Sequence, residues 1–291
     1  MDEIMVGGIV TAWQMPHPPI AVPEVGRGRE AEISGTLRAM REASDYIVRG
    51  NAGVIILISP HAPVSGGYIS VSGGGALKGD LGRFGARGAS VGFDGDGGTA
   101  RMICEEAGLA GVSARISERV HGGAAGLDHG SVVPLYFINE ALKKSGSTPP
   151  ELIIISIAYL SNAELYRFGA CVARAATVSG KRAALITSGD LSHKLTADGP
   201  YGFDPAGPEF DKFIMECIKS GDAESLLGTD EMTLERAAQC GFYGLLMLYG
   251  AIGETQKQKS AVQAGGDGLK LPRILSYEGV FGVGYAIAQI L

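Results

Sequence analysis

Residues 53–58, Gly-Val-Ile-Ile-Leu-Ile, are the stretch that most restricts how this chain can fold. After Gly53, five aliphatic residues follow without interruption, which is typical of a strand buried on both faces. Pro60 cannot extend a central ladder of hydrogen bonds, so the strand should end there. His61 then lies where a buried strand opens into a loop. In open α/β sheets, ligands bind outside the carboxyl ends of the strands.

Two further histidines follow apolar segments in the same way. Residues 4–13 predict a strand that runs into the prolines around His17, and residues 182–187 predict a buried strand that ends shortly before His193. Residues 30–48, which precede the strand at 53–58, carry apolar side chains at helical spacing. This alternation of strands and helices predicts an α/β sheet.

The remaining pattern completes an α/β domain without an internal repeat or a dividing linker. We expect further strands at 68–71, 152–158, 274–277 and 283–290, and helices at 97–107, 132–142, 161–178, 209–219, 223–227 and 232–251. The glycine-rich span 73–98 lacks the Gly-Lys-Ser/Thr ending of a phosphate loop and is interpreted as a surface excursion. Residues 198–208 predict a loop that can cover a cleft, and 256–271 a mobile loop.

Charge and cysteine usage narrow the class of protein. The net charge is -6 and no basic cluster is present, which argues against nucleic-acid binding. The four cysteines form no Cys-x-x-Cys pair, which suits a reducing, cytoplasmic setting. The first residues lack the basic and apolar regions of a signal peptide. No apolar run reaches the roughly 18 residues that span a bilayer, so no membrane partner is expected.

The chain has only five histidines, at positions 17, 61, 121, 129 and 193. His17, His61 and His193 follow three separate predicted strands, and His129 lies in the glycine turn 126–130. Histidines that converge from several strand ends indicate a metal site or an acid/base site. His121 has no such context and is interpreted as a loop histidine.

Motifs along nearly the whole chain resemble those of one superfamily. They are His-Pro-Pro-Ile at 17–20, Val-Pro-Glu-Val-Gly at 22–26, Ser-Pro-His at 59–61, Leu-Asp-His-Gly at 127–130, Ser-Gly-Asp-Leu-Ser-His at 188–193, Asp-Gly-Pro-Tyr-Gly-Phe at 198–203, Cys-Gly at 240–241 and Ser-Tyr-Glu-Gly at 276–279. In this order they resemble the class III extradiol ring-cleavage dioxygenases, the LigB-like proteins. The likeness is greatest to the branch of the MEMO proteins and of the LigB-like domains found beside an AMMECR-type domain.

The resemblance implies a single LigB-like domain over residues 1–291, with three α/β/α layers around a mostly buried, mixed central sheet. It implies a metal-dependent oxidoreductase that uses non-heme iron(II) and dioxygen on a catechol-like or other small aromatic substrate. His17 and His61 match the two histidine ligands of the metal. His193 matches the base that takes the phenol proton, and His129 matches a second histidine that contacts substrate or oxygen.

The resemblance also suggests roles for two aspartates, the place of the metal and the partners of the protein. Asp128 and Asp190 either orient the neighbouring histidines or cap the following turns. The metal is expected in a cleft formed by the loops at 15–20, 60–66, 126–131 and 189–204. Relatives in this branch self-associate or pair with a small second subunit, so a homo-oligomer or an AMMECR-type partner domain is expected.

The sequence departs from the dioxygenase pattern at the third metal ligand. Ring-cleaving members have a glutamate near the start of the last long helix, where this chain has Gln-Cys-Gly at 239–241. The resemblance to the MEMO branch makes Cys240 the expected third ligand, and Glu235 and Glu278 are the alternatives. A thiolate favours zinc, copper(I) or a thiolate-bound iron. The alternative functions are therefore a metal-binding partner protein without ring cleavage and a zinc-dependent hydrolase.

Overall fold

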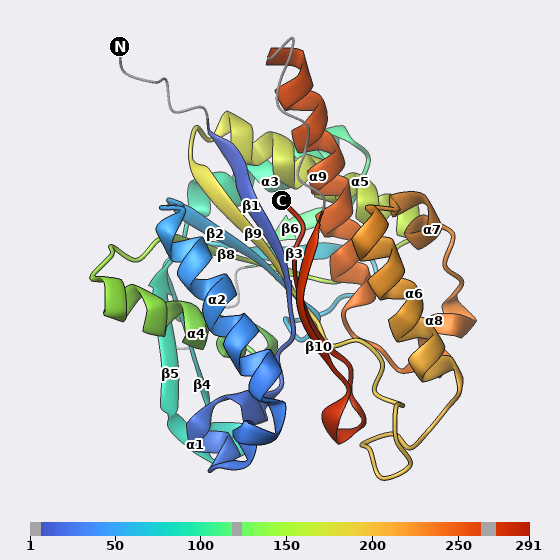
Figure 1. The fold of residues 1–291 in the computed structure, drawn as a ribbon. Helices are drawn as coiled ribbons and strands as arrows, with labels where there is room; N and C mark the ends of the chain where they lie inside the picture. The colour runs from blue at the N-terminus through green and yellow to red at the C-terminus, as the bar shows by residue number, and fades with distance from the viewer. Residues whose placement is uncertain (1–6, 118–123, 263–271) are drawn as a thin grey trace.

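The structure is a computed structural model that describes residues 7–117, 124–262 and 272–291. Within these residues, a mixed eight-stranded sheet forms the centre of the protein (Figure 1). In spatial order its strands are β10 (Arg273–Glu278), β11 (Tyr285–Gln289), β1 (Gly8–Met15), β9 (Arg182–Ser188), β2 (Val54–Ser59), β8 (Glu151–Ser156), β3 (Ile69–Ser72) and β6 (Ala114–Ile116). The four central strands β1, β9, β2 and β8 are parallel to one another. β11 runs antiparallel to β1, and β3 runs antiparallel to β8.

Helices cover both faces of this sheet, which confirms the predicted three-layer arrangement. One face packs against α2 (Ser34–Arg49) and α4 (His129–Ser145), and the other against α3 (Gly97–Leu109), α5 (Asn162–Val178) and α9 (Phe242–Val262) (Figure 1). Every residue of β2 is buried, because both faces of the strand are covered. α5 begins with the predicted capping box, in which Ser161 and Glu164 each accept a hydrogen bond from the other's backbone N–H.

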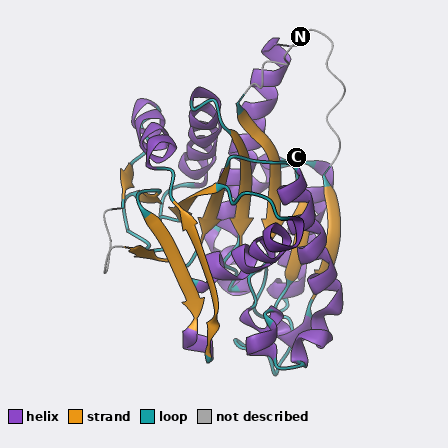
Figure 2. Cartoon of the chain, turned by 90° about the vertical axis from the view of Figure 1, so that its left-hand side faces the viewer, coloured by secondary structure: helices purple, strands orange, loops and turns teal. Residues whose placement is uncertain are grey.

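The glycine-rich span was predicted wrongly as a surface excursion. It forms β4 (Ala76–Leu81) and β5 (Ala86–Asp94), which pair with β7 (Ala124–Gly126) in a separate three-stranded sheet. Alternate residues of β5 are buried, including Val91 and Phe93, and they pack on the α4 side of the core. The hairpin extends beyond the main sheet, with the 3₁₀ turn η3 (Gly82–Phe84) at its tip (Figure 2).

The predicted helix at 232–251 is interrupted. α8 (Glu231–Ala237) ends at Ala238, which has a left-handed backbone with φ of 50°, and α9 begins at Phe242. α9 then continues to Val262, so the first part of the predicted loop at 256–271 is helical, and residues 263–271 lie outside the described part of the chain. Four shorter helical segments and one further pair of helices complete the described fold: η1 (Pro19–Ala21), α1 (Pro23–Gly26), η2 (Arg29–Ile33), η4 (Val280–Gly282), α6 (Ala206–Ser220) and α7 (Ala223–Leu227).

Among the residues that the structure describes, no helix combines the length and the apolar character needed to cross a membrane.

Candidate metal centre

The order of the central strands brings the predicted histidines together. β9 lies between β1 and β2, and its last residues pair with Met15 on one side and Ile58 on the other. The carboxyl ends of these three parallel strands therefore meet at one edge of the sheet. The loops that carry His17, His61 and residues 189–193 leave the sheet next to one another, which is where ligands bind in folds of this kind.

His17 is buried, and its protonation pattern follows from its neighbours. Its Nδ1 lies 2.9 Å from Ser188 Oγ, and Ser188 Oγ donates its own hydrogen to the Gly130 carbonyl at 2.5 Å. Because that hydroxyl has only one hydrogen, it accepts a hydrogen bond from Nδ1–H. The Nε2 of His17 then carries the free lone pair, as a metal ligand requires.

Three donor atoms converge at this lone pair. The Nε2 atoms of His17 and His61 are 3.1 Å apart, and Cys240 Sγ lies 3.7 Å from His17 Nε2. All three ligand atoms lie within 4.8 Å of one another. Bonds of about 2.0–2.1 Å to nitrogen and 2.3 Å to sulfur would separate ligands by about 2.9–3.6 Å at angles of 90–110°. The spacing and the chemistry of the donors therefore fit a metal ion, and the exposed His61 leaves one side of the site open to solvent.

The interruption between α8 and α9 places Cys240 at this point. The N–H groups of Cys240 and Gly241 donate to the Asp190 carbonyl at 3.4 and 3.0 Å, and Asp190 N–H donates to Cys240 Sγ at 3.3 Å. A Cβ on Gly189 would lie 2.2 Å from the Gly241 Cα, so the two backbones touch. Burial, followed by the charge of Asp190, raises the pKa of the Cys240 thiol well above its usual range. A bound metal cation would act in the opposite direction.

Asp190 adds a carboxylate that the sequence analysis considered only as an orienting or capping residue. Its Oδ1 accepts the backbone N–H of His17 at 2.9 Å, and its Oδ2 lies 3.9 Å from His17 Nε2 and 4.0 Å from His193 Nε2. Asp190, His193 and Cys240 form a second group of potential metal ligands that shares the cysteine with the first. Burial raises the pKa of Asp190 to about 6.

His129 and His193 lie near the three donors. The ring of His129, at the start of α4, stacks on His61 with centroids 4.2 Å apart and contacts Phe84 of η3 at 5.2 Å. Burial, followed by the charge of His61, lowers the pKa of His129 to about 4. His193 packs edge-on against Tyr201 at 5.7 Å, and its buried Nδ1 has no hydrogen-bond partner among the described residues.

The other candidate residues lie elsewhere or have structural roles. Glu278 accepts hydrogen bonds from Gly35 N–H and Thr36 N–H at the start of α2, and Glu235 is exposed on α8. Asp128 caps α4 by accepting from Ser131 N–H, which confirms the capping alternative for this residue. His121 lies outside the described residues.

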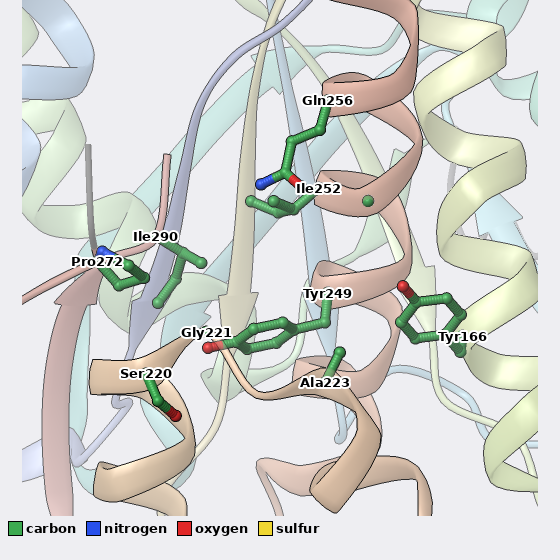
Figure 3. A pocket seen from close by; sticks show the side chains of 10 residues that line it. Tyr166, Ser220, Gly221, Ala223, Tyr249, Ile252, Gln256, Pro272 and Ile290 are labelled. Carbon is green, nitrogen blue, oxygen red and sulfur yellow. The ribbon is translucent and has the colours of Figure 1, made fainter. Parts of the chain in front are cut away.

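A cavity of about 240 Å³ lies away from these residues, between α5, α6, α7 and α9 (Figure 3). Tyr249, Ile252 and Gln256 project into it from α9, and Pro272 and Ile290 close the opposite side. These α9 residues are two to four turns beyond Cys240 along the chain. The cavity contains none of the predicted site residues.

Phe84 and Ser188 are the site residues that the sequence analysis missed. Phe84 belongs to the hairpin that was interpreted as a surface excursion, so no sequence signal placed it beside His129. Ser188 was visible as the first residue of the Ser-Gly-Asp-Leu-Ser-His motif, but its role depends on the Gly130 carbonyl, which is distant in the sequence.

Comparisons with known proteins agree with the fold and the motifs. Residues 11–287 match the model of the family described as the catalytic LigB subunit of aromatic ring-opening dioxygenase. Protein CA_C1420 of Clostridium acetobutylicum is 35% identical over 282 residues, which cover 96% of this chain and 56% of that protein. The chain therefore spans about half the length of this relative.

A solved structure supports the same fold. The uncharacterized protein JW3007 from Escherichia coli K12 superimposes with a TM-score of 0.60 at 15% sequence identity, over 97% of this chain and 99% of that one. At this identity the likeness concerns the fold alone. The match to the family model over residues 11–287 establishes that the chain belongs to the LigB family.

Proposed function

We propose that this protein is a metal-dependent oxidoreductase that uses iron(II) and dioxygen on a catechol-like or other small aromatic substrate. The observation that carries the proposal is the convergence of His17 Nε2 and His61 Nε2 at 3.1 Å, with the Cys240 thiol and the Asp190 carboxylate both within 4 Å of His17. Two imidazoles with one further ligand on a single side form the kind of open site on which non-heme iron chemistry depends.

The roles of the residues follow from their positions. His17 and His61 would hold the metal, with Cys240 as the third ligand and the Asp190 carboxylate as the alternative. When bound, iron(II) supplies the coordination positions that a catecholate and dioxygen require. His193 would accept the proton of a phenolic hydroxyl, and its Nε2 lies 4.0 Å from Asp190 Oδ2. His129 and Phe84 would form a wall against which an aromatic ring can pack.

Cys240 favours a second candidate, a metal-binding partner protein without ring-cleavage activity. Thiolate is a soft ligand that suits zinc, copper(I) and thiolate-bound iron. Cys240 Sγ lies 3.7 Å from His17 Nε2, and the four cysteines of the chain are free thiols. Free thiols agree with the reducing, cytoplasmic setting that forms part of the proposal.

Elemental analysis of anaerobically purified protein separates the two candidates. We expect one equivalent of iron and oxygen uptake on a panel of catechols, and loss of the metal in His17→Ala and His61→Ala with the circular dichroism spectrum retained. Zinc or copper that is lost in Cys240→Ser, without oxygen uptake by the parent protein, would favour the second candidate. Unfolding of both histidine variants, or metal retained in both, would contradict the assignment of His17 and His61 as ligands.

A further inference from the structure

A pocket of about 300 Å³ lies beside the segments that carry His61 and His129. It lies between the main sheet, through β3 and β8, and the small sheet of β4 and β7. Ala62 and Pro63, which directly follow His61, form one side, and Asp128, which directly precedes His129, forms another. The Asp128 carboxylate accepts a hydrogen bond from Ser59 Oγ at 2.7 Å and so ties these two sides together.

The walls of the pocket differ in chemistry. Hydroxyl groups come from Ser70, Ser72, Ser117 and Ser156, of which Ser156 is buried in the floor and accepts the Ser70 N–H at 2.9 Å. Within the described part of the chain, the other three hydroxyl groups have no hydrogen-bond partner in the protein. A serine hydroxyl both donates and accepts, so this wall suits hydroxyl or amide groups.

The facing wall is apolar and packs against the flat side of whatever enters. Leu77 of β4, which is buried, and Leu127, which directly follows β7, form it, whereas the buried Ile154 of β8 lies among the serines of the main sheet, where it pairs with Ser72. The volume is about twice that of an apolar cavity that holds benzene, which is about 150 Å³. A ring of six atoms with a short polar substituent therefore fits.

The charge of the lining excludes ionised ligands. Among the described residues that line the pocket, Asp128 is the single charged one, and there is no cation to pair with an acid. Both Asp128 oxygens are already used, since Oδ1 accepts from Ser59 and from Ser131 N–H and Oδ2 accepts from the Ser131 hydroxyl. An anion would be repelled by Asp128, and a cation would share a carboxylate that already accepts three hydrogen bonds, so burial of either charge would cost more than burial of a neutral polar group.

We propose that this pocket binds a neutral ring that carries a hydroxyl or amide group, as the arm of the substrate that is remote from the metal. The assignment to the substrate rests on the proposed function, whereas the binding chemistry rests on the pocket alone. Specificity would then come from differential binding of this arm beside His61, because interactions away from the reacting atoms position a substrate.

The test uses four probes of similar shape: benzyl alcohol and benzamide, which are neutral, and benzoate and benzylammonium, which are charged. Saturation-transfer NMR on the metal-free protein should show both neutral probes binding at least about tenfold more tightly than the charged ones. Ser72→Leu, which fills the pocket from β3, should weaken the neutral probes at least tenfold. Ser90→Leu, at an exposed position of β5 outside the pocket, is the matched control and should not change binding.

A second arm of the experiment tests the relation to the metal centre without measuring turnover. Cobalt(II) added to the protein should broaden the signals of bound benzamide, and His61→Ala should remove the broadening while benzamide still binds. Binding of benzamide without cobalt(II) binding to the parent protein would refute the proposed function and leave the pocket assignment standing. The pocket assignment itself is overturned if no neutral probe binds, if a charged probe binds best, or if Ser72→Leu behaves like Ser90→Leu.

Discussion

The contact between Gly189 and Gly241 is the point at which the proposed metal centre should be most sensitive to one added carbon. A Cβ on Gly189 would stand 2.2 Å from the Gly241 Cα. Gly189 is held from the other side, because its N–H donates to the Met15 carbonyl of β1 at 2.9 Å. The methyl group of Gly189→Ala therefore has to push the segment that carries Cys240 away from β9.

The size of this effect follows from the same contact. An ordinary van der Waals separation begins at 3.4 Å, so the two segments have to separate by about 1.2 Å. Overpacking of a fixed backbone costs about 1–3 kcal/mol of folding free energy. The same shift strains the hydrogen bonds from Cys240 and Gly241 to the Asp190 carbonyl. Loss of such support around metal ligands weakens metal binding by about 10–100-fold.

Two measurements check this prediction. Thermal unfolding of the metal-free protein should show a lower melting temperature for Gly189→Ala, and cobalt(II) titration followed by absorption should show weaker binding with a smaller thiolate-to-cobalt band. Gly88→Ala is the matched control, since a Cβ at this position of β5 meets no atom within 4 Å. We expect this control to match the parent protein in cobalt(II) affinity and in its absorption spectrum.

The reasoning is refuted if Gly189→Ala binds cobalt(II) with the affinity and the thiolate band of the parent protein. That result would mean either that Cys240 binds the metal without needing the Gly189–Gly241 contact, or that Cys240 is not a metal ligand. A loss of stability without any change in cobalt(II) binding would refute the link between this contact and the site.

Three further predictions concern the surroundings of the site. Ser188→Ala removes the acceptor that fixes the His17 tautomer, so metal affinity measured by competitive chelation should fall by about 10–100-fold while the fold is retained. Burial raises the pKa of Asp211 to about 6, so the folded protein binds this proton more tightly than the unfolded chain does. The stability that Asp211 contributes is therefore present below about pH 4 and is lost as the pH rises through about 6, by at most about 3 kcal/mol. Asp211→Asn should flatten this part of the stability profile in denaturant titrations, and an unchanged profile would contradict the assignment. Glu278→Ala should cost about 0.5–2 kcal/mol by exposing the start of α2 and should leave metal content unchanged, whereas loss of the metal would reinstate Glu278 as a ligand.

Local pattern was sufficient for much of the fold. The apolar run at 53–58 and the prolines after it predicted β2 and its end at Ser59, because burial on both faces and the missing proline N–H are properties of the segment itself. The helix at 161–178 was confirmed to within a residue, since its capping box is a local signal. These short-range rules also placed His17, His61 and His193 at strand ends.

Local pattern failed where a contact distant in the sequence decides the structure. The hairpin at 76–94 was missed because glycines and a register shift between Asp80 and Leu81 obscure its alternation, and its buried side chains need α4 to pack against. The helix at 232–251 was wrongly taken as continuous. The helix is interrupted at Ala238, next to the contact between Gly189 and Gly241. This contact joins two segments that are distant in the sequence, so neither segment alone could predict it.

The sequence by itself indicated the candidate site residues and predicted that His17, His61 and His193 each follow a strand. Only the tertiary structure decided that they meet, because β9 inserts between β1 and β2 and brings positions 17, 61 and 190 to one edge of the sheet. Which groups lie beside His17 as candidates for a third metal ligand was also decided only by the tertiary structure. The interrupted helix brings the Cys240 thiol there, and the turn after β9 brings the Asp190 carboxylate. Such arrangements depend on the pairing order of strands and on backbone contacts, which are non-local.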